Sequence, residues 1–196
     1  MADYRYSIHM NDILILYYSK NDSTKRMARV IARGVESITN TSAVIRTVKS
    51  HHYKDSDDLL VSKDDLKSCS GMIIGSPTHF GNMAAPLKEF FDNTTEEWLN
   101  NTLENKLGGV FTSTSSMHGG QETTLLSMML PLLHHGMIIA GVPYSEKALS
   151  TTTSGGTPYG PSHVSNNQKN ELTEEEKKIC LAYGKRFAMI ANNMNS

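Results

Sequence analysis

The residue types best suited to ligand chemistry gather in Gly75–Met83, whose sequence is Gly-Ser-Pro-Thr-His-Phe-Gly-Asn-Met. This segment follows the apolar run Gly71–Ile74 and precedes a helix-like segment, so we expect it at the carboxyl end of a strand. Hydroxyl, imidazole and amide groups beside a phenyl ring suit a flat, partly apolar heteroaromatic molecule with polar edges. An ordinary strand-to-helix connection is the alternative interpretation. The candidate ligand-binding residues here are Pro77, Thr78, His79, Phe80, Gly81 and Asn82.

A second polar segment, Ser19–Thr24, follows the apolar run Ile13–Tyr18 and opens an amphipathic helix. Free backbone N–H groups and the positive end of the helix dipole favour an anion there. Because no glycine-rich pyrophosphate fingerprint is present, a single phosphate is predicted. Taken alone, the segment fits helix capping better, and Asp22 would repel a phosphate unless it points away or Lys20 offsets its charge. The candidate phosphate ligands are Ser19, Lys20, Asn21, Asp22, Ser23 and Thr24.

The third polar segment is Thr112–Gly120, at the end of the apolar run Lys106–Ser113. Its hydroxyl and backbone amide groups suit the carbonyls and ring nitrogens of a heteroaromatic ligand, and its glycines allow close passage of backbone. A solvent-exposed loop is the alternative interpretation. The candidate ligand-binding residues here are Thr112, Ser113, Thr114, Ser115, Ser116 and Gly119.

Strands and helices must alternate along the chain to position these segments. Strand-length apolar runs occur at Ile13–Tyr18, Ala43–Val48, Gly71–Gly75, Lys106–Ser113 and Met137–Val142. Helices are predicted over Met27–Ile38, from Ala84 or Pro86, over Gln121–His135, and after Thr173, which opens the capping box Thr173–Glu176. Pro131 should kink or restart the third of these helices. Loops are expected over 51–67, with a short helix near Lys63, and over 150–168.

This alternation predicts a parallel sheet with right-handed crossovers and helices on both faces. Five strands suit a flavodoxin-like α/β fold, a three-layer sandwich with strand order 2-1-3-4-5. In that order the first and third strands are neighbours, and the segments after Tyr18 and Gly75 should meet at their carboxyl ends. We expect a single domain over 12–196, preceded by a patternless, disordered extension over 1–11.

Composition excludes several classes of function. The 196 residues are 38% hydrophobic, and the net charge of -1 gives no basis for binding nucleic acid or an anionic membrane. Cys69 and Cys180 lack CxxC spacing and the adjacent histidine pairs lack HxxxH spacing, so buried reduced thiols and no metal site are predicted. No apolar stretch approaches the roughly 20 residues of a membrane span, and no signal peptide is evident, which favours the cytoplasm.

Several motifs in the same chain order resemble the WrbA family of FMN-dependent NAD(P)H:quinone oxidoreductases. They are Leu16–Ser19, Gly75–Met83, His118–Glu122, His134–Met137 and Gly155–Gly160. The resemblance extends from about Ile13 to the C-terminal helix, which makes it far more specific than any single motif.

The resemblance implies a role for each polar segment. Ser19–Thr24 would bind the FMN phosphate, while Pro77–Phe80 and Thr112–Gly119 would hold the isoalloxazine. His134 would sit close to the flavin. The family forms tetramers, in which a tryptophan matching Trp98 reaches a neighbouring subunit's flavin site and shapes the pocket for nicotinamide or quinone. No residue would act as a covalent nucleophile.

The chain departs from the family at three places. Asn21 and Asp22 replace a tyrosine-glycine pair whose tyrosine is linked to nicotinamide binding, so Asn21 is a candidate substrate-side residue and the choice between NADH and NADPH stays open. The stretch between Val48 and Lys63 is shorter than usual, and His79 replaces a basic residue. A flavodoxin-like one-electron carrier and an adaptor protein that has lost FMN remain alternatives. The natural quinone is not determined.

Overall fold

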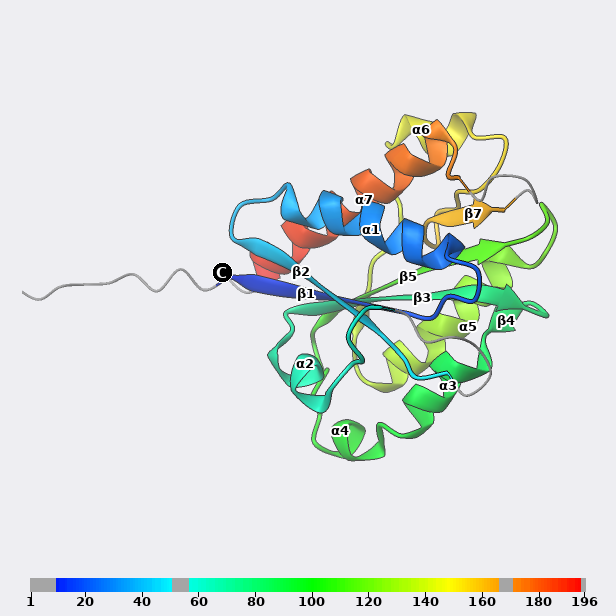
Figure 1. Ribbon diagram of the computed structural model, residues 1–196. Helices are drawn as coiled ribbons and strands as arrows, with labels where there is room; N and C mark the ends of the chain where they lie inside the picture. The colour runs from blue at the N-terminus through cyan, green and yellow to red at the C-terminus, as the bar shows by residue number, and fades with distance from the viewer. Residues whose placement is uncertain (1–9, 51–56, 166–170, 195–196) are drawn as a thin grey trace, which may run out of the picture.

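A central sheet carries helices on both faces (Figure 1) in the computed structural model, which describes residues 10–50, 57–165 and 171–194. Parallel strands follow the order β2-β1-β3-β5-β6. Their bounds are β1 Asn11–Tyr17, β2 Thr41–Thr47, β3 Gly71–His79, β5 Leu107–Thr114 and β6 Ile138–Ile139. This order confirms the predicted flavodoxin-like arrangement 2-1-3-4-5. Two short strands join it, β4 (Asn82–Met83) against β3 and β7 (Ser162–Val164) against β5.

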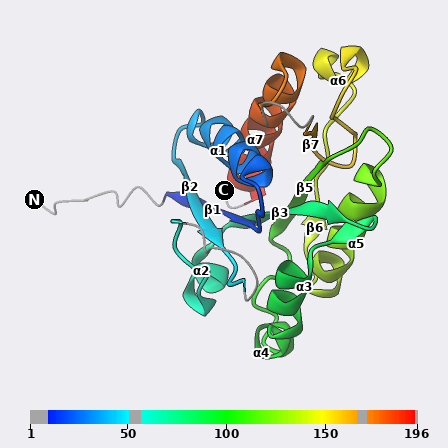
Figure 2. The same ribbon diagram turned by 45° about the vertical axis from the view of Figure 1, so that its right-hand side comes forward.

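Strand β1 shows why its apolar run is continuous. Ile13, Ile15 and Tyr17 pack with α1 (Ser23–Glu36) and α7 (Glu174–Met194), while Leu14 and Leu16 pack on the other face. Successive strand residues point to opposite faces, so a strand covered on both sides must be apolar throughout. The second face is covered by α2 (Lys63–Ser68), α3 (Ala85–Asp92), α4 (Thr95–Leu99) and α5 (Gln121–His134), as Figure 2 shows.

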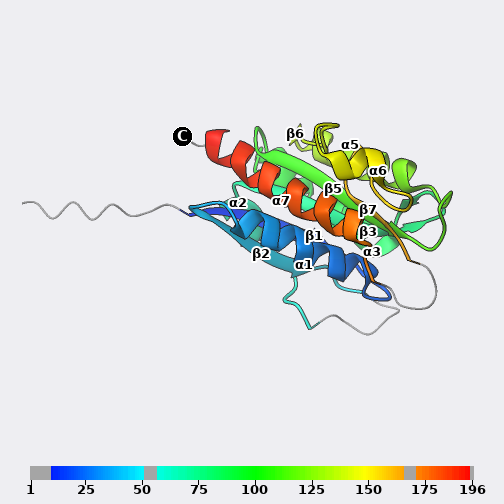
Figure 3. The same ribbon diagram turned by 90° about the horizontal axis from the view of Figure 1, so that it is seen from above.

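Helices α1 and α7 run side by side across the sheet (Figure 3). Two glycines allow them to approach each other. A Cβ atom added at Gly34 would collide with the Leu181 carbonyl oxygen, and one added at Gly184 would collide with the Ile31 carbonyl oxygen. The backbones of α1 and α7 are therefore in close contact in the C-terminal half of α1.

Tyr183 of α7 links β5 to the residue that follows β6. Its buried hydroxyl accepts a hydrogen bond from the Val110 N–H at 3.0 Å and donates one to the Ala140 carbonyl at 3.0 Å. Gly109 leaves room for this hydroxyl, since an added Cβ would collide with it. The aromatic residue thus satisfies backbone groups that apolar packing alone would leave unpaired.

The predicted loop over 150–168 is wrong in part, because α6 (Lys147–Thr151) ends within it and β7 lies within it. Residues 166–168 fall outside the described part of the chain. The expected fifth strand, Met137–Val142, is also longer than the strand observed, β6. β6 pairs only with the start of β5, Leu107–Gly108, and β7 pairs with its end, Thr112–Thr114. One predicted edge strand is thus replaced by two short ones.

A kink or a restart was the expectation at Pro131, and α5 is continuous through this residue, so a restart does not occur. Pro131 lies in the last turn, where the missing N–H costs one hydrogen bond near the end of the helix. The short helix near Lys63 and the capping box at the start of α7 are confirmed: the Glu176 N–H donates to the Thr173 hydroxyl at 3.2 Å, and the Thr173 N–H donates to the Glu176 carboxylate at 2.8 Å.

Cys69 and Cys180 are both buried free thiols, as predicted. Strand β1 begins at Asn11, the last residue of the expected extension, and residues 1–9 lie outside the described part of the chain. None of the described helices is both long and apolar enough to cross a membrane.

Candidate functional site

The three polar segments meet at the carboxyl ends of β1, β3 and β5, as the predicted strand order requires. They enclose a cavity of about 280 Å³. Its lining residues are Ser19, Lys20, Asn21, Ser23, Thr24, Pro77, Thr78, His79, Ser113, Thr114, Ser115 and Ser165. Most of these side chains carry a hydroxyl or amide group, so the cavity can offer many hydrogen bonds to a ligand.

The first turn of α1 forms one wall of this cavity. Asp22 is the N-cap residue, with φ of 61°, and its side chain makes no capping hydrogen bond to the helix. Asp22 is exposed, whereas Ser23 and Thr24 are buried. The Thr24 hydroxyl lies 2.8 Å from the Ser113 hydroxyl of β5. Side-chain capping by Asp22 therefore does not account for this segment, and the helix start remains suited to an anion.

An unsatisfied polar atom supports a ligand in this cavity. The Ser19 hydroxyl oxygen is buried and has no hydrogen-bond partner among the described residues. Buried hydroxyl groups are nearly always hydrogen-bonded, so this one calls for a partner that a phosphate oxygen could supply. Burial, with a contribution from the Lys20 charge, lowers the pKa of His79, which keeps this imidazole neutral at pH 7.

The β3–β4 hairpin carries the second wall and turns at Phe80 and Gly81, whose φ angles are 54° and 75°. Positive φ at both central residues is the pattern of a type I′ turn, which favours Asn-Gly rather than Phe-Gly. The Phe80 ring is fully exposed. Gly120, just before α5, packs closely against this turn, because an added Cβ would lie 2.9 Å from the Gly81 Cα. Its φ of 89° also favours glycine at this position.

A second cavity of about 910 Å³ lies between this hairpin and helices α3, α4 and α5. It shares His79 with the first cavity. Its lining residues are His79, Phe80, Asn82, Met83, Ala85, Lys88, Phe91, Asp92, Thr94, Thr95, Trp98, Ser127, Leu130, Pro131, His134 and His135. Aromatic and aliphatic walls with a few polar groups are typical of sites that bind a flat organic molecule.

Trp98 and His134 meet at the far side of the second cavity. The indole N–H of Trp98 donates to the His134 carbonyl at 2.9 Å, and Trp98 stays half-exposed. Nearby, the buried His135 Nε2 lies 2.9 Å from the Thr94 hydroxyl, and its Nδ1 has no partner among the described residues. Burial lowers the pKa of His135, so this imidazole is neutral at pH 7.

The structure thus divides the predicted site residues between two adjoining cavities. Phe80, Asn82, Trp98 and His134 line the second cavity, and neither cavity is lined by Asp22, Gly81, Thr112, Ser116 or Gly119. The Thr112 hydroxyl instead donates to the Ser76 carbonyl at 2.8 Å, between two strands. Gly119 packs on Thr114, since an added Cβ would collide with the Thr114 hydroxyl.

Sequence reasoning missed several lining residues. Ser165 lines the first cavity, and Lys88, Asp92, Thr94, Leu130 and His135 line the second. The only signal for Ser165 was the short run Ser162–Val164 before it, which is too brief to show strand periodicity. Among the described residues, no group of three or more His, Cys, Asp or Glu side chains could hold a metal ion.

Comparison with known proteins agrees with this geometry. Residues 12–149 match the family model described as NADPH-dependent FMN reductase. A protein of Chromohalobacter salexigens named NAD(P)H dehydrogenase (quinone) is 38% identical, over 93% of this chain and 98% of that relative. A protein of the same name from Geotalea daltonii is 36% identical, over 91% of this chain and 96% of that relative.

A solved structure shows the same fold. The flavodoxin, WrbA-like protein from Agrobacterium tumefaciens superposes with a TM-score of 0.70 at 22% identity, covering 93% of this chain and 98% of that chain. The family match and the two curated relatives extend over most of the sequence and include all three polar segments. The chain therefore belongs to the NADPH-dependent FMN reductase family, in agreement with the resemblance to FMN-dependent quinone oxidoreductases that its motifs indicated.

Proposed function

We propose that this chain is an FMN-dependent oxidoreductase that accepts a hydride from NADH or NADPH and passes two electrons to a quinone. The observation that carries the proposal is the pair of adjoining cavities. One is small, hydroxyl-rich and placed at a helix start, and the other is large and mostly apolar. The names of the curated relatives and the family match support the same activity.

The small cavity fits the phosphate end of FMN. Backbone N–H groups at the start of α1 and the hydroxyls of Ser19, Ser23 and Thr24 would donate to phosphate oxygens, and Lys20 would add positive charge. Asp22, which is exposed and does not line the cavity, would leave the phosphate free of direct repulsion. Asn21 would face the substrate side.

The hairpin and the end of β5 would hold the ring system. Pro77, Thr78 and His79 of β3 line the small cavity, as do Thr114 at the end of β5 and Ser115 after it. When bound, FMN supplies the hydride and electron transfer chemistry, for which the protein needs no covalent nucleophile. The chain's own contribution is to orient the ring and to exclude water from one face of it.

The large cavity would take nicotinamide and quinone in turn. Phe80, Trp98 and Leu130 provide apolar contact for a flat ring, and Lys88 and Asp92 form an ion pair at its margin. His134, which lines the large cavity at the end of α5, would influence charge near the flavin. One pocket that serves both substrates in succession implies ping-pong kinetics.

We also propose that the chain forms a homotetramer, acts in the cytoplasm and folds as one domain over 12–196. Exposed apolar residues on α4 and α5 support association, since they form a run of large side chains on neighbouring helices. These residues are Trp98, Leu99, Leu126, Leu130 and Leu133. Sedimentation analysis of the FMN-loaded protein tests the homotetramer, and a monomer at micromolar concentration would contradict it.

The activity is tested with purified protein loaded with FMN. We expect NADH- or NADPH-dependent reduction of a soluble benzoquinone, with parallel lines in double-reciprocal plots. Flavin binding without quinone-dependent oxidation of either nucleotide would contradict the enzyme and favour a one-electron carrier. A folded protein that binds no FMN would favour the adaptor alternative.

A further inference from the structure

A buried carboxylate organises the chain behind the small cavity. Glu176 of α7 is fully buried and accepts hydrogen bonds from the Val164 N–H at 3.0 Å, the Gly155 N–H at 2.9 Å and the Ser154 hydroxyl at 2.6 Å. It lies 2.8 Å from Nδ1 of His163, which is also buried. Burial alone would raise the pKa of Glu176, but these hydrogen bonds, led by that of His163, lower it to about 2, so the carboxylate is ionised.

These contacts fix β7 on the edge of β5. His163 is in register with Ser113, and the next strand position pairs Val164 with Thr114. Directly after β7, the Ser165 N–H donates to the Thr114 carbonyl at 2.7 Å. Strand β7 has only three residues, and strands this short are not stable without outside support. The Glu176 contacts supply this support.

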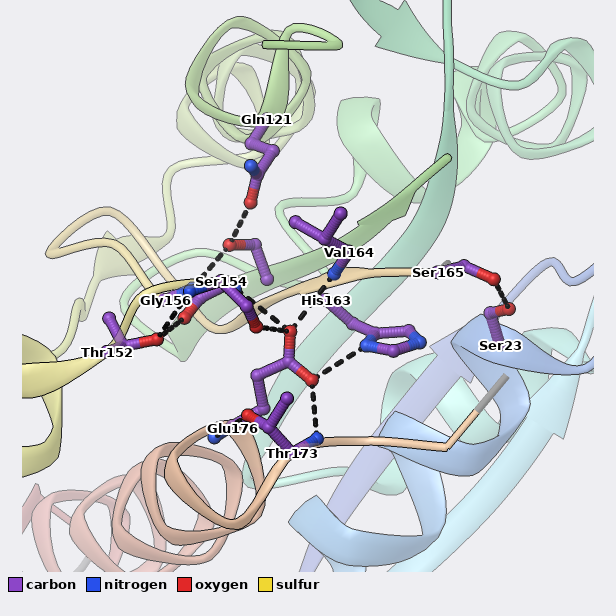
Figure 4. A network of polar contacts seen from close by, with 12 residues as sticks. Ser23, Gln121, Thr152, Ser154, Gly156, His163, Val164, Ser165, Thr173 and Glu176 are labelled. Atoms are coloured by element: carbon purple, nitrogen blue, oxygen red, sulfur yellow. Dashed lines mark hydrogen bonds and ion pairs between the residues drawn. The ribbon is translucent and has the colours of Figure 1, made fainter. Parts of the chain in front are cut away.

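Ser165 is thereby placed at the small cavity. It lines this cavity, and its hydroxyl lies 3.4 Å from the Ser23 hydroxyl in the first turn of α1. Figure 4 shows the His163 ring lying between the Glu176 carboxylate and the start of α1, with Ser165 and Ser23 joined beyond it. The Nε2 of His163 is buried and has no partner among the described residues.

We propose that Ser165 is a further ligand of the flavin phosphate and that His163 and Glu176 are the positioning residues that hold it there. This inference rests on the proposed function, because it assigns the small cavity to the phosphate. The Ser165 hydroxyl lines the cavity beside the first turn of α1. His163 separates the ionised Glu176 from the cavity, so the carboxylate anchors β7 without facing the bound anion.

The test compares FMN with riboflavin, which lacks the phosphate. Dissociation constants for both are measured by quenching of flavin fluorescence in the wild-type protein and in Ser165→Ala, His163→Leu and His163→Asn. Ser165→Ala should weaken FMN binding about tenfold, as loss of a charge-assisted hydrogen bond does, and leave riboflavin binding within about twofold. His163→Leu should show the same selective loss, whereas His163→Asn keeps a donor near the Nδ1 position and should restore most of it.

The double variant tests whether His163 acts through Ser165. Adding Ser165→Ala to His163→Leu should weaken FMN binding no further, because both changes remove the same contact. If the ratio of FMN to riboflavin affinity is unchanged in Ser165→Ala, or if the two losses multiply, the inference is wrong. If circular dichroism shows that His163→Leu does not fold, the ratio of FMN to riboflavin affinity in Ser165→Ala alone decides. A wild-type protein that binds neither flavin overturns the proposed function itself.

Discussion

Replacing Phe80 by asparagine should stabilise the fold and weaken substrate binding in the large cavity at the same time. Phe80 and Gly81 form the two-residue turn between β3 and β4, with φ of 54° and 75°. A type I′ turn favours Asn-Gly, because asparagine tolerates positive φ and phenylalanine does not. The Phe80 ring is fully exposed, so its removal loses no buried surface in the folded protein.

The expected gain in stability follows from the free-energy cost of holding residue 80 at positive φ. The left-handed conformation costs an ordinary L-residue roughly 1–2 kcal/mol, and asparagine recovers about 1 kcal/mol of it. For a chain of this length, about 1 kcal/mol raises Tm by about 2–4 °C. Phe80→Ala keeps the Cβ atom and hence the strain, so its stability should stay within about 0.5 kcal/mol of the wild type. Urea denaturation of the FMN-free protein measures both differences.

Both variants lose the ring and should lose function equally. Contact of one aromatic ring with another contributes about 1 kcal/mol, which corresponds to about a fivefold rise in the KM for quinone. If Phe80→Asn is no more stable than Phe80→Ala, the strain argument is refuted. If neither variant raises the KM for quinone, Phe80 does not contact the quinone.

Three further predictions concern the fold that holds the site. Tyr183→Phe leaves the buried Val110 N–H without its partner and should cost about 1–3 kcal/mol in urea denaturation, whereas the exposed Tyr144→Phe should have no effect. Gly34→Ala forces α1 away from α7 and should lower Tm by several degrees in calorimetry, and an unchanged Tm would contradict the close contact. The pKa of Glu176 falls from 4.5 to about 2 on folding. Its contribution to the free energy of unfolding is therefore complete above pH 4.5 and is lost as the pH falls towards 2. The acid limb of a plot of unfolding free energy against pH should flatten in Glu176→Gln.

Patterns with a short period made most of the fold predictable. The apolar run Ile13–Tyr18 indicated a strand covered on both faces, and β1 is packed in this way. The spacing of apolar residues after Met27 indicated α1, and Thr173–Glu176 indicated the start of α7. Each of these signals is complete within about four to twelve neighbouring residues.

Segments stabilised by distant partners were not predictable. Strand β7 exists because β5 offers its open edge and Glu176 accepts a hydrogen bond from the Val164 N–H. Three residues contain no periodicity, so the sequence predicts a loop there. The same holds for Ser165, whose place at the cavity depends on a glutamate in another helix. A capping box predicted Glu176 but not its burial or its hydrogen bonds to two other segments.

The order of strands and helices, the three polar segments and their meeting at one edge of the sheet follow from the sequence alone. Each depends on local periodicity and on general rules of parallel-sheet topology. Only the tertiary structure decided which side chains line each cavity, that Thr112 turns into the sheet and that Ser165 turns towards α1. The physical reason is distance along the chain. Contacts such as those of Glu176 with Gly155 and Val164 join residues whose local sequences carry no information about one another.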